Sequence, residues 1–234
     1  MSNSLPRANK NLGQHFLNDQ SIISSICNDY VKEADCIIEV GPGPAILTRK
    51  LSTLNLPYHV IEKDIRFKQN LTQYLDETQI TFADILTIEL SELIANLGWE
   101  GKKIWFVSNL PYNIGVPILI KFMQNTNIHF MSLMFQKEVG LKIIPETSSK
   151  KGMGSLHALC TNFFNCKLLL NVPPSSFSPP PKVDSVVISM DKKENNIIPL
   201  AKFKHFEKFL RNIFQFKRKQ CFKILKMSYS ESDI

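Results

Sequence analysis

Four short apolar runs, each followed by a segment with helical spacing, dominate the sequence between residues 36 and 125. Strands that alternate with helices form parallel sheets with right-handed crossovers, because a parallel neighbour is reached only through a long connection. We therefore predict an α/β fold with a doubly wound, mostly parallel sheet. The predicted strands are 36–40, 58–61, 80–83 and 104–107, and the predicted helices are 45–54, 66–75, 88–97 and 117–124.

The remaining sequence predicts a fifth strand and a separate C-terminal segment. Residues 129–135 have the pattern of a strand and 136–144 that of a helix, and two further strand-like runs, 167–172 and 183–190, flank the proline-rich loop PPSSFSPPPK. The charged, Asn-rich stretch 191–196 is typical of a linker. We therefore predict a main domain over residues 1–190 and a basic helical segment, a partial domain, over 191–234.

Composition excludes several classes of protein. The longest apolar stretches are far shorter than the roughly 18 residues of a membrane-spanning helix, and the N-terminal sequence has no apolar signal core or cleavage site. We therefore expect a cytoplasmic protein that does not associate with membranes. The five cysteines are odd in number and form no C-x-x-C pair, so we expect reduced thiols, with neither a disulfide framework nor a metal site.

Positive charge is concentrated near the C-terminus. The net charge is +7, and 11 of the 28 Lys and Arg residues lie between residues 192 and 226, where only Glu194 and Glu207 oppose them. Clustered basic residues favour binding to a polyanion such as RNA, although a solubilising helix face is the alternative. The phenylalanines among these charges have helical spacing, which favours packing into a core over stacking on bases.

A glycine turn follows the first predicted strand in the stretch IIEVGPGPAILT. Gly41 and Gly43 allow a ligand to approach the backbone closely. Ile46 stands where a dinucleotide fingerprint has its third glycine, and Pro42 and Pro44 remove N–H groups that could hold a pyrophosphate. The turn therefore favours a smaller, nucleoside-like ligand over a dinucleotide.

Two acidic residues end the second and third predicted strands. Ligands of open α/β sheets bind at the carboxyl ends of the strands, so Glu62 and Asp84 are expected near the glycine turn. The carboxylate of Glu62 can accept hydrogen bonds from both ribose hydroxyls, and Asp84 could accept one from an adenine amino group. Each acid alone would be read as a solvated cap, but both lie in register with the glycine turn.

The fourth predicted strand leads into Asn109-Leu110-Pro111-Tyr112. This tetrapeptide combines a side-chain amide oxygen, a main-chain carbonyl fixed by the following proline and an aromatic face. Two acceptors suit the exocyclic amine of a nucleobase, and positioning of such a nucleophile can supply up to roughly 7 to 11 kcal/mol without a strong base. Tyr112 would stack on an extruded base. A simple turn after a strand is the alternative.

Taken together, the motifs NLGQHFLND, IIEVGPGPAILT, VIEKD, FADIL, SNLPYNI, MFQKEV and PPSSFSPPPKVDSVV resemble those of the small-subunit ribosomal RNA adenine N6-dimethyltransferases. The resemblance implies a Rossmann-like methyltransferase fold with a small helical C-terminal domain. It also implies S-adenosylmethionine as the methyl donor, with S-adenosylhomocysteine as product and no metal. The implied reaction is N6,N6-dimethylation of two adjacent adenosines near the 3′ end of the 16S ribosomal RNA, during small-subunit maturation.

Site residues carried over by motif position are of three kinds: catalytic residues around the target base, RNA contacts and cofactor contacts. The resemblance implies that Phe177 is a second aromatic residue against the target base, although this phenylalanine could instead fill the core. The basic run Lys217, Arg218 and Lys219 is expected to bind RNA. The expected cofactor contacts, together with the glycine turn, are His15, Leu17, Gly41, Gly43, Glu62, Asp84 and Asn109, and the amine-holding motif is Asn109, Leu110, Pro111 and Tyr112.

The chain departs from the family pattern in three places. Pro44 replaces an apolar residue, Met153 stands where an aromatic is common, and the C-terminal domain is expected to be short by several tens of residues. Partners are expected to be the small-subunit RNA and the immature small subunit, with the protein itself a monomer. Two alternatives stay open: a non-catalytic or weakly active assembly factor, and a large-subunit methyltransferase of the macrolide-resistance type.

Overall fold

The computed structural model describes residue 6, residues 14–144 and 154–215, and residues 223 and 225. Its centre is a seven-stranded sheet with the order β4-β3-β2-β5-β6-β9-β7. The first five of these strands are parallel, and β9 pairs antiparallel with both β6 and β7. This confirms the predicted mostly parallel α/β sheet. The strands are β2 (Cys36–Val40), β3 (Tyr58–Glu62), β4 (Ile80–Phe82), β5 (Ile104–Asn109), β6 (Ile128–Gln136), β7 (Phe164–Val172) and β9 (Ser185–Lys192).

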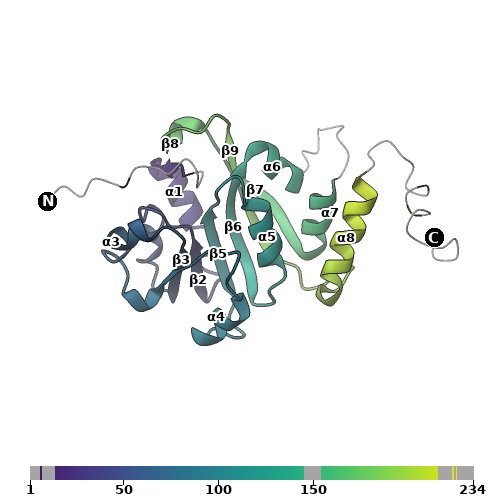
Figure 1. The fold of residues 1–234 in the computed structure, drawn as a ribbon, viewed down its shortest axis with the longest axis horizontal. Helices are drawn as coiled ribbons and strands as arrows, with labels where there is room; N and C mark the ends of the chain where they lie inside the picture. Colours follow the sequence, from purple (N-terminus) through teal and green to yellow (C-terminus); the bar gives the residue numbers. More distant parts are fainter. Residues whose placement is uncertain (1–5, 7–13, 145–153, 216–222, 224, 226–234) are drawn as a thin grey trace.

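Helices cover both faces of the sheet, which gives three layers (Figure 1). Neighbouring strand residues point to opposite faces, so Ile37 and Trp105 belong to one core cluster while Ile38 and Phe106 belong to the other. One cluster is closed by α1 (Gln20–Cys27), α2 (Thr48–Leu51) and α3 (Lys68–Leu71). The other is closed by α4 (Leu90–Asn96), α5 (Gly115–Met123), α6 (Lys137–Ile143), α7 (Ser155–Phe163) and α8 (Phe203–Phe214).

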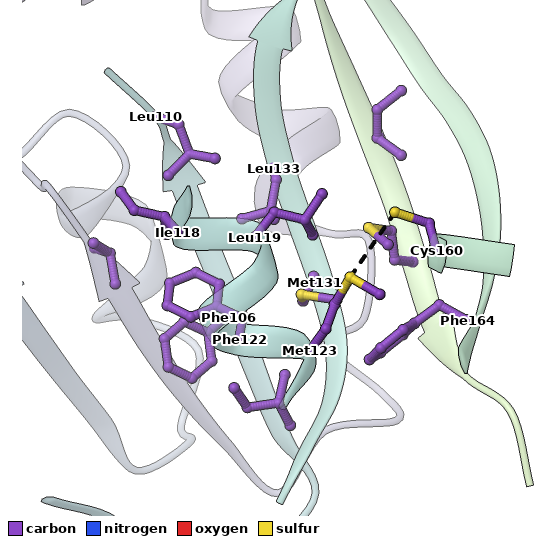
Figure 2. Packing of buried hydrophobic residues seen from close by; sticks show 14 of the residues in the cluster. Phe106, Leu110, Ile118, Leu119, Phe122, Met123, Met131, Leu133, Cys160 and Phe164 are labelled. Carbon is purple, nitrogen blue, oxygen red and sulfur yellow. Dashed lines mark hydrogen bonds between the residues drawn. The ribbon is translucent and has the colours of Figure 1, made fainter. Parts of the chain in front are cut away.

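Aromatic and sulfur-containing side chains fill the space between α5 and the sheet (Figure 2). The ring centroids of Phe106 and Phe122 are 4.1 Å apart, and the thiol of Cys160 lies 3.9 Å from the sulfur of Met123. The four described cysteines are free, and three of them are buried. Within the described residues, no helix is long and apolar enough to cross a membrane.

Two predicted helices are much shorter than expected. The helix predicted over 45–54 is reduced to Thr48–Leu51, because Gly43 and Ala45 both have positive φ angles and keep the chain out of the helical conformation. The helix predicted over 66–75 is a 3₁₀ turn, Ile65–Phe67, followed by the single turn Lys68–Leu71. These corrections leave the strand ends, and thus the expected binding edge, unchanged.

One α-helix and two short strands were not predicted from the sequence. Helix α7 was not predicted, although its buried residues Leu159, Cys160 and Phe163 recur at helical spacing. The strands β1 (Phe16–Leu17) and β8 (Phe177–Ser178) pair antiparallel as a separate two-stranded sheet. Strands of two residues carry no periodic pattern, so only the folded structure reveals this contact between the N-terminal segment and the proline-rich loop.

The basic C-terminal segment contains a helix packed on the main core, and its first two residues, in the predicted linker 191–196, still belong to β9. Phe203 and Leu210 of α8 are buried in the cluster that contains Phe106, and the rings of Phe163 and Phe203 lie 5.2 Å apart. Figure 1 shows α8 beside α7, at the opposite end of the molecule from α3. The described phenylalanines of this segment, Phe203, Phe206, Phe209 and Phe214, therefore pack against the core as expected. Phe216 and Phe222 lie outside the described residues, and the boundary at residues 190 and 191 stays a prediction. Met153, Lys217, Arg218 and Lys219 lie outside the described residues.

Gly140 permits the close approach of α6 to the sheet. A Cβ atom at this position would lie 2.2 Å from Cγ2 of Val186, so Gly140→Ala must displace β9 or the helix. Overpacking of this kind costs about 1 to 3 kcal/mol, and we expect a loss of that size in the free energy of unfolding measured with urea. Gly154→Ser is the control, because its Cβ meets open space and Ser is a favourable N-cap. Equal stability of the two variants would contradict this packing.

Candidate active site

A cavity of about 260 Å³ lies at the carboxyl ends of the parallel strands. It lies between the glycine turn after β2, the ends of β3 and β4, the tetrapeptide after β5 and the N-terminal segment around β1. The structure thus brings together residues that are distant in sequence. Of the predicted site residues, the cavity is lined by His15, Leu17, Gly41, Gly43, Glu62, Asp84, Asn109, Leu110, Pro111 and Tyr112.

The glycine turn is fixed to the end of β3 by main-chain groups. Gly41 and Gly43 have φ angles of 67° and 54°, in the left-handed region that glycine adopts without steric cost. The N–H of Gly41 donates to the carbonyl of Ile61 at 2.9 Å, and the N–H of Gly43 donates to Oε2 of Glu62 at 2.8 Å. The N–H of Gly43 is therefore used within the protein, and its expected contribution to ligand binding is the absence of a side chain.

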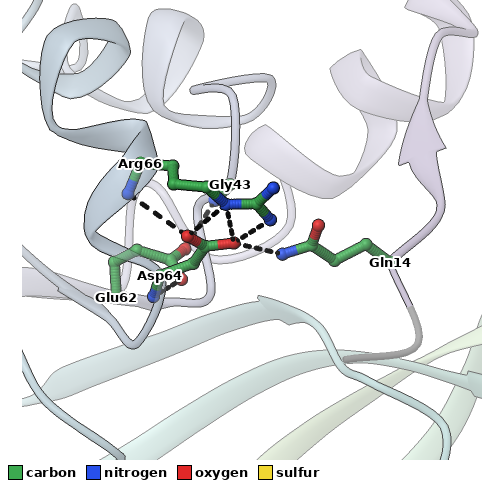
Figure 3. A network of polar contacts seen from close by, with 5 residues as sticks. All are labelled: Gln14, Gly43, Glu62, Asp64 and Arg66. Carbon is green, nitrogen blue, oxygen red and sulfur yellow. Dashed lines mark hydrogen bonds and ion pairs between the residues drawn. The ribbon is translucent and has the colours of Figure 1, made fainter. Parts of the chain in front are cut away.

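Glu62 lines the cavity and joins the glycine turn to the loop after β3 (Figure 3). Its Oε1 accepts a hydrogen bond from the N–H of Asp64 at 2.7 Å, and its Oε2 accepts the bond from Gly43. Burial raises the pKa of this carboxyl group, while the two main-chain donors oppose the shift. Each carboxylate oxygen has two lone pairs, so both oxygens can still accept a bond from a ligand hydroxyl.

Asp64 connects the N-terminal segment to the same region, a role that sequence analysis missed. Its carboxylate accepts hydrogen bonds from Nε of Arg66 at 2.8 Å and from Nε2 of Gln14 at 3.1 Å. The hydrogen bond from Arg66 is the main cause that lowers the pKa of Asp64 to about 2. Asp64 is therefore ionised at neutral pH and holds Gln14 at the rim of the cavity.

Asp84 lies at the cavity and pairs with Lys63. Its Oδ2 is 2.9 Å from Nζ of Lys63, and its Oδ1 accepts a bond from the N–H of Leu86 at 2.9 Å. The hydrogen bond from Lys63 is the main cause that lowers the pKa of the carboxyl group, and the bond from Leu86 lowers it further. Asp84 is thus ionised at neutral pH and can accept a hydrogen bond from an amino group. Its contact with an adenine stays a prediction.

The tetrapeptide after β5 is held by two side-chain hydrogen bonds. Nδ2 of Asn109 donates to the carbonyl of His15 at 3.1 Å, which leaves the amide oxygen as the acceptor that an exocyclic amine needs. The hydroxyl group of Tyr112 lies 2.6 Å from Oγ of Ser185, at the start of β9. This contact holds the Tyr112 ring in place. Burial raises the pKa of the phenol, so its hydroxyl stays protonated at neutral pH.

The two aromatic residues assigned to base contact differ in accessibility. Tyr112 is half-buried and lines the cavity. Phe177 is only 3% exposed, belongs to the core cluster around Trp105, and does not line the cavity in the described part of the chain. Its ring meets that of His15 edge-on, with centroids 6.5 Å apart. The core-filling alternative therefore describes the observed position of Phe177, and its contact with a base stays a prediction.

Glu39, which the sequence analysis passed over, lies buried beside the cavity. Thr48 donates a hydrogen bond to its Oε2 at 2.7 Å, and the hydroxyl of Tyr58 donates to the same atom. Burial is the main cause that raises the pKa of Glu39 to about 7. The available signal was its position as the sole charged residue within the buried strand Cys36–Val40. Through Thr48, Glu39 fixes the start of α2 behind the glycine turn.

The raised pKa of Glu39 predicts a pH-dependent stability. Because the pKa in the folded state exceeds the usual value of 4.5, folded protein binds the extra proton and loses stability as the pH rises from about 4.5 to 7. We expect Glu39→Gln to gain up to about 2 to 3 kcal/mol relative to wild type between pH 5 and pH 8. Urea unfolding at both pH values measures this change, with exposed Glu92→Gln as the control. A stability difference independent of pH would contradict it.

Metal ligation has no candidate group in the described residues, where no three His, Cys, Asp or Glu side chains are placed to share an ion. The expected absence of a metal stays a prediction.

Comparison with known proteins shows similarity along nearly the whole chain. The family model for ribosomal RNA adenine dimethylase matches residues 6–233. Ribosomal RNA small subunit methyltransferase A of Neisseria meningitidis serogroup C is 35% identical over 232 residues, which cover 97% of this chain and 86% of that protein. The Clostridium botulinum (strain Kyoto) protein of the same name is 34% identical over 224 residues, 93% of this chain and 79% of its own length.

Two solved structures have the same fold. The crystal structure of a dimethyladenosine transferase from Plasmodium falciparum is 26% identical, with a TM-score of 0.74, and the match covers 91% of this chain and 75% of that one. The 23S rRNA methyltransferase ErmE is 22% identical, with a TM-score of 0.68 over 93% of this chain and 86% of that one. The second match supports the fold alone.

Proposed function

Because the chain belongs to the ribosomal RNA adenine dimethylase family, we propose that it dimethylates N6 of two adjacent adenosines near the 3′ end of the small-subunit ribosomal RNA. It is an S-adenosylmethionine-dependent ribosomal RNA adenine methyltransferase with a role in small-subunit maturation. The observation that carries the proposal is the single cavity shared by Glu62, Asp84 and the tetrapeptide from Asn109 to Tyr112. The proposed site of action is the cytoplasm.

The donor set around the cavity fits S-adenosylmethionine. Glu62 would accept hydrogen bonds from the ribose hydroxyls and Asp84 one from the adenine amino group, since both have acceptor lone pairs that face polar ligand groups. Gly41 and Gly43 leave room for the ligand beside the main chain, and His15 and Leu17 close the cavity from the N-terminal side. When bound, S-adenosylmethionine supplies an electrophilic methyl group. S-adenosylhomocysteine would occupy the same contacts.

The side chain of Asn109 and the carbonyl of Leu110 would hold the target amine. Each accepts one hydrogen bond from the N6 amino group, so the nitrogen lone pair is directed away from both acceptors and toward the methyl donor. Pro111 fixes the main chain after this carbonyl. Positioning of this kind raises the rate through orientation, without a strong base. The protonated phenol of Tyr112, bonded to Ser185, is consistent with a ring that stacks on the base rather than one that takes a proton.

The basic C-terminal segment would dock the RNA. Lys204, Lys208 and Arg211 are exposed on α8, spaced so that they share one helix face, and Lys217, Arg218 and Lys219 follow in the chain. Phosphate contacts from such residues release counterions from RNA and make affinity dependent on salt. We propose that residues 191–234 form the RNA-docking part and residues 1–190 the methyltransferase domain.

Neutralisation of the basic run tests this docking role. We expect replacement of Lys217, Arg218 and Lys219 by Gln to weaken binding to small-subunit RNA and to lower the slope of log affinity against log salt by about 2 to 3. The control replaces the exposed Lys32, Lys102 and Lys103, which lie near the amino ends of β2 and β5, at the opposite edge from the cavity. A slope that stays equal to that of the control would contradict the proposal.

Transfer of labelled methyl groups to purified ribosomal subunits tests the proposed function. The protein is incubated with isotope-labelled S-adenosylmethionine and with either small or large subunits that lack the modification. We expect label in the small-subunit RNA alone. Label in the large-subunit RNA would favour the macrolide-resistance type of methyltransferase, and binding to small subunits without label would indicate a non-catalytic assembly factor. Either of these results would contradict the proposal.

A further inference from the structure

The imidazole ring of His15 stacks on the ring of Tyr112, and both residues line the cavity. The two ring centroids are 5.7 Å apart and the ring planes are inclined by 26°, a stacked arrangement. We propose that the His15 side chain occupies the stacking position of the target base on Tyr112 in the base-free protein. The adenine displaces this side chain when it enters the site. This inference rests on the proposed function, because it assigns the stacking face of Tyr112 to the base.

The spacing of the two rings leaves no room for a third. Stacked bases are separated by about 3.4 Å, so an adenine between His15 and Tyr112 would need about twice that distance between the rings. The observed separation of 5.7 Å is smaller, and it includes any lateral offset of the centroids. Entry of the base on this face of Tyr112 therefore requires the His15 ring to move.

The contacts of His15 allow its ring to move while its main chain stays in place. The main chain is held by the hydrogen bond from Asn109 to its carbonyl at 3.1 Å and by the adjacent pairing of β1 with β8. Among the described residues, the ring has one hydrogen bond, from Nδ1 to the carbonyl of Pro179 at 2.8 Å. Rotation of the half-buried side chain thus breaks this hydrogen bond, the stack on Tyr112 and the edge-on contact with Phe177. It leaves the main-chain wall of the cavity intact.

The position of the His15 ring also explains how Phe177 could reach a base. This side chain is buried and meets the His15 ring edge-on, so His15 lies in contact with both aromatic residues assigned to the base. Departure of the imidazole would uncover Tyr112 and Phe177 together. In the free protein the His15 ring thus contacts both Tyr112 and Phe177. When the base enters, its planar ring takes the place of the imidazole.

Two substitutions with opposite expected effects test the inference. With unmethylated small subunits and saturating S-adenosylmethionine, His15→Ala removes the competitor of the base, and we expect kcat/KM for the RNA to rise about three- to tenfold, the worth of one aromatic pair. His15→Trp provides a stronger competitor, and we expect a decrease of similar size. His129→Ala is the matched control, because His129 also contacts an aromatic ring, that of Phe130, away from the cavity. It should stay within twofold of wild type.

An independent measurement examines the contact itself. In the free protein the ring protons of His15 should be shielded by the Tyr112 ring current, and Tyr112→Leu should remove this shift in the NMR spectrum. A decrease of kcat/KM in His15→Ala, or an unshifted His15 resonance, would overturn this proposal and make His15 a fixed wall of the site. Wild-type protein that transfers no methyl group would instead contradict the proposed function, so the two failures are distinguishable.

Discussion

Replacement of Asn109 by Ala lowers kcat for methylation by about 10³-fold. The substitution removes one of the two acceptors that hold the target amine, and loss of a single positioned hydrogen-bonding group in an active site costs about 10² to 10³ in kcat. It also removes the hydrogen bond from Asn109 to the carbonyl of His15, so the N-terminal wall of the cavity is held less firmly. RNA binding should be retained, because the phosphate contacts are expected from the C-terminal segment.

Single-turnover methylation of small subunits measures this effect, and RNA binding is followed in parallel. Asn109→Asp keeps an oxygen acceptor but loses the donor to His15, so it should retain about tenfold more activity than Asn109→Ala. Asn171→Ala, at an exposed position of β7, is the matched control and should behave like wild type. Activity of Asn109→Ala within tenfold of wild type would contradict the role of this residue in holding the amine.

Replacement of Glu62 by Gln should raise the dissociation constant for S-adenosylmethionine by at least about a hundredfold. Hydrogen bonds to a charged group contribute about 1.5 to 3 kcal/mol each, and the ribose is expected to form two with this carboxylate. The amide group of Gln would also direct its NH₂ at one of two main-chain donors, the N–H of Gly43 or that of Asp64. The glycine turn would then lose its support on β3.

Calorimetric titration with S-adenosylmethionine and S-adenosylhomocysteine checks this prediction. Glu92→Gln, on the exposed side of α4, removes the same charge without a contact to the cavity and serves as the control. Unfolding with urea shows whether the Glu62 variant remains folded at the temperature of the titration. A dissociation constant within threefold of that of the control would contradict the assignment of Glu62 to the ribose.

Much of the fold could be predicted because the strands are continuous apolar runs. Residues Cys36–Val40 are buried throughout, and Ile104–Asn109 are buried up to the last residue, so both strands stand out against their helical surroundings. Parallel strands place their carboxyl ends at one edge, which is why Glu62 and Asp84 could be assigned to one cavity without knowledge of the structure. The helices were harder, since the positive φ of Ala45 that delays α2 has no signal in its residue type.

The parts of the site that escaped prediction depend on contacts distant in sequence. The pairing of Phe16–Leu17 with Phe177–Ser178 decides where His15 lies and why Phe177 is buried, and no local pattern reports a two-residue strand. Glu39 was overlooked because a single acid in an apolar strand has no periodicity, although burial of a carboxyl group is itself unusual. The sequence thus indicates which residue types form the site, while the folded chain decides which of them touch.

Mass spectrometry of the small-subunit RNA shows whether this chain dimethylates adenosines. Unmethylated small subunits are incubated with this protein and S-adenosylmethionine, and the modified nucleotides are then located in the RNA sequence. We expect N6,N6-dimethyladenosine at two adjacent positions near the 3′ end, and a strong decrease of it with Asn109→Ala. Unmodified RNA, despite cofactor binding confirmed by calorimetry, would contradict the claim that this chain is a dimethyltransferase and would leave it a protein that binds the small subunit without methylating it.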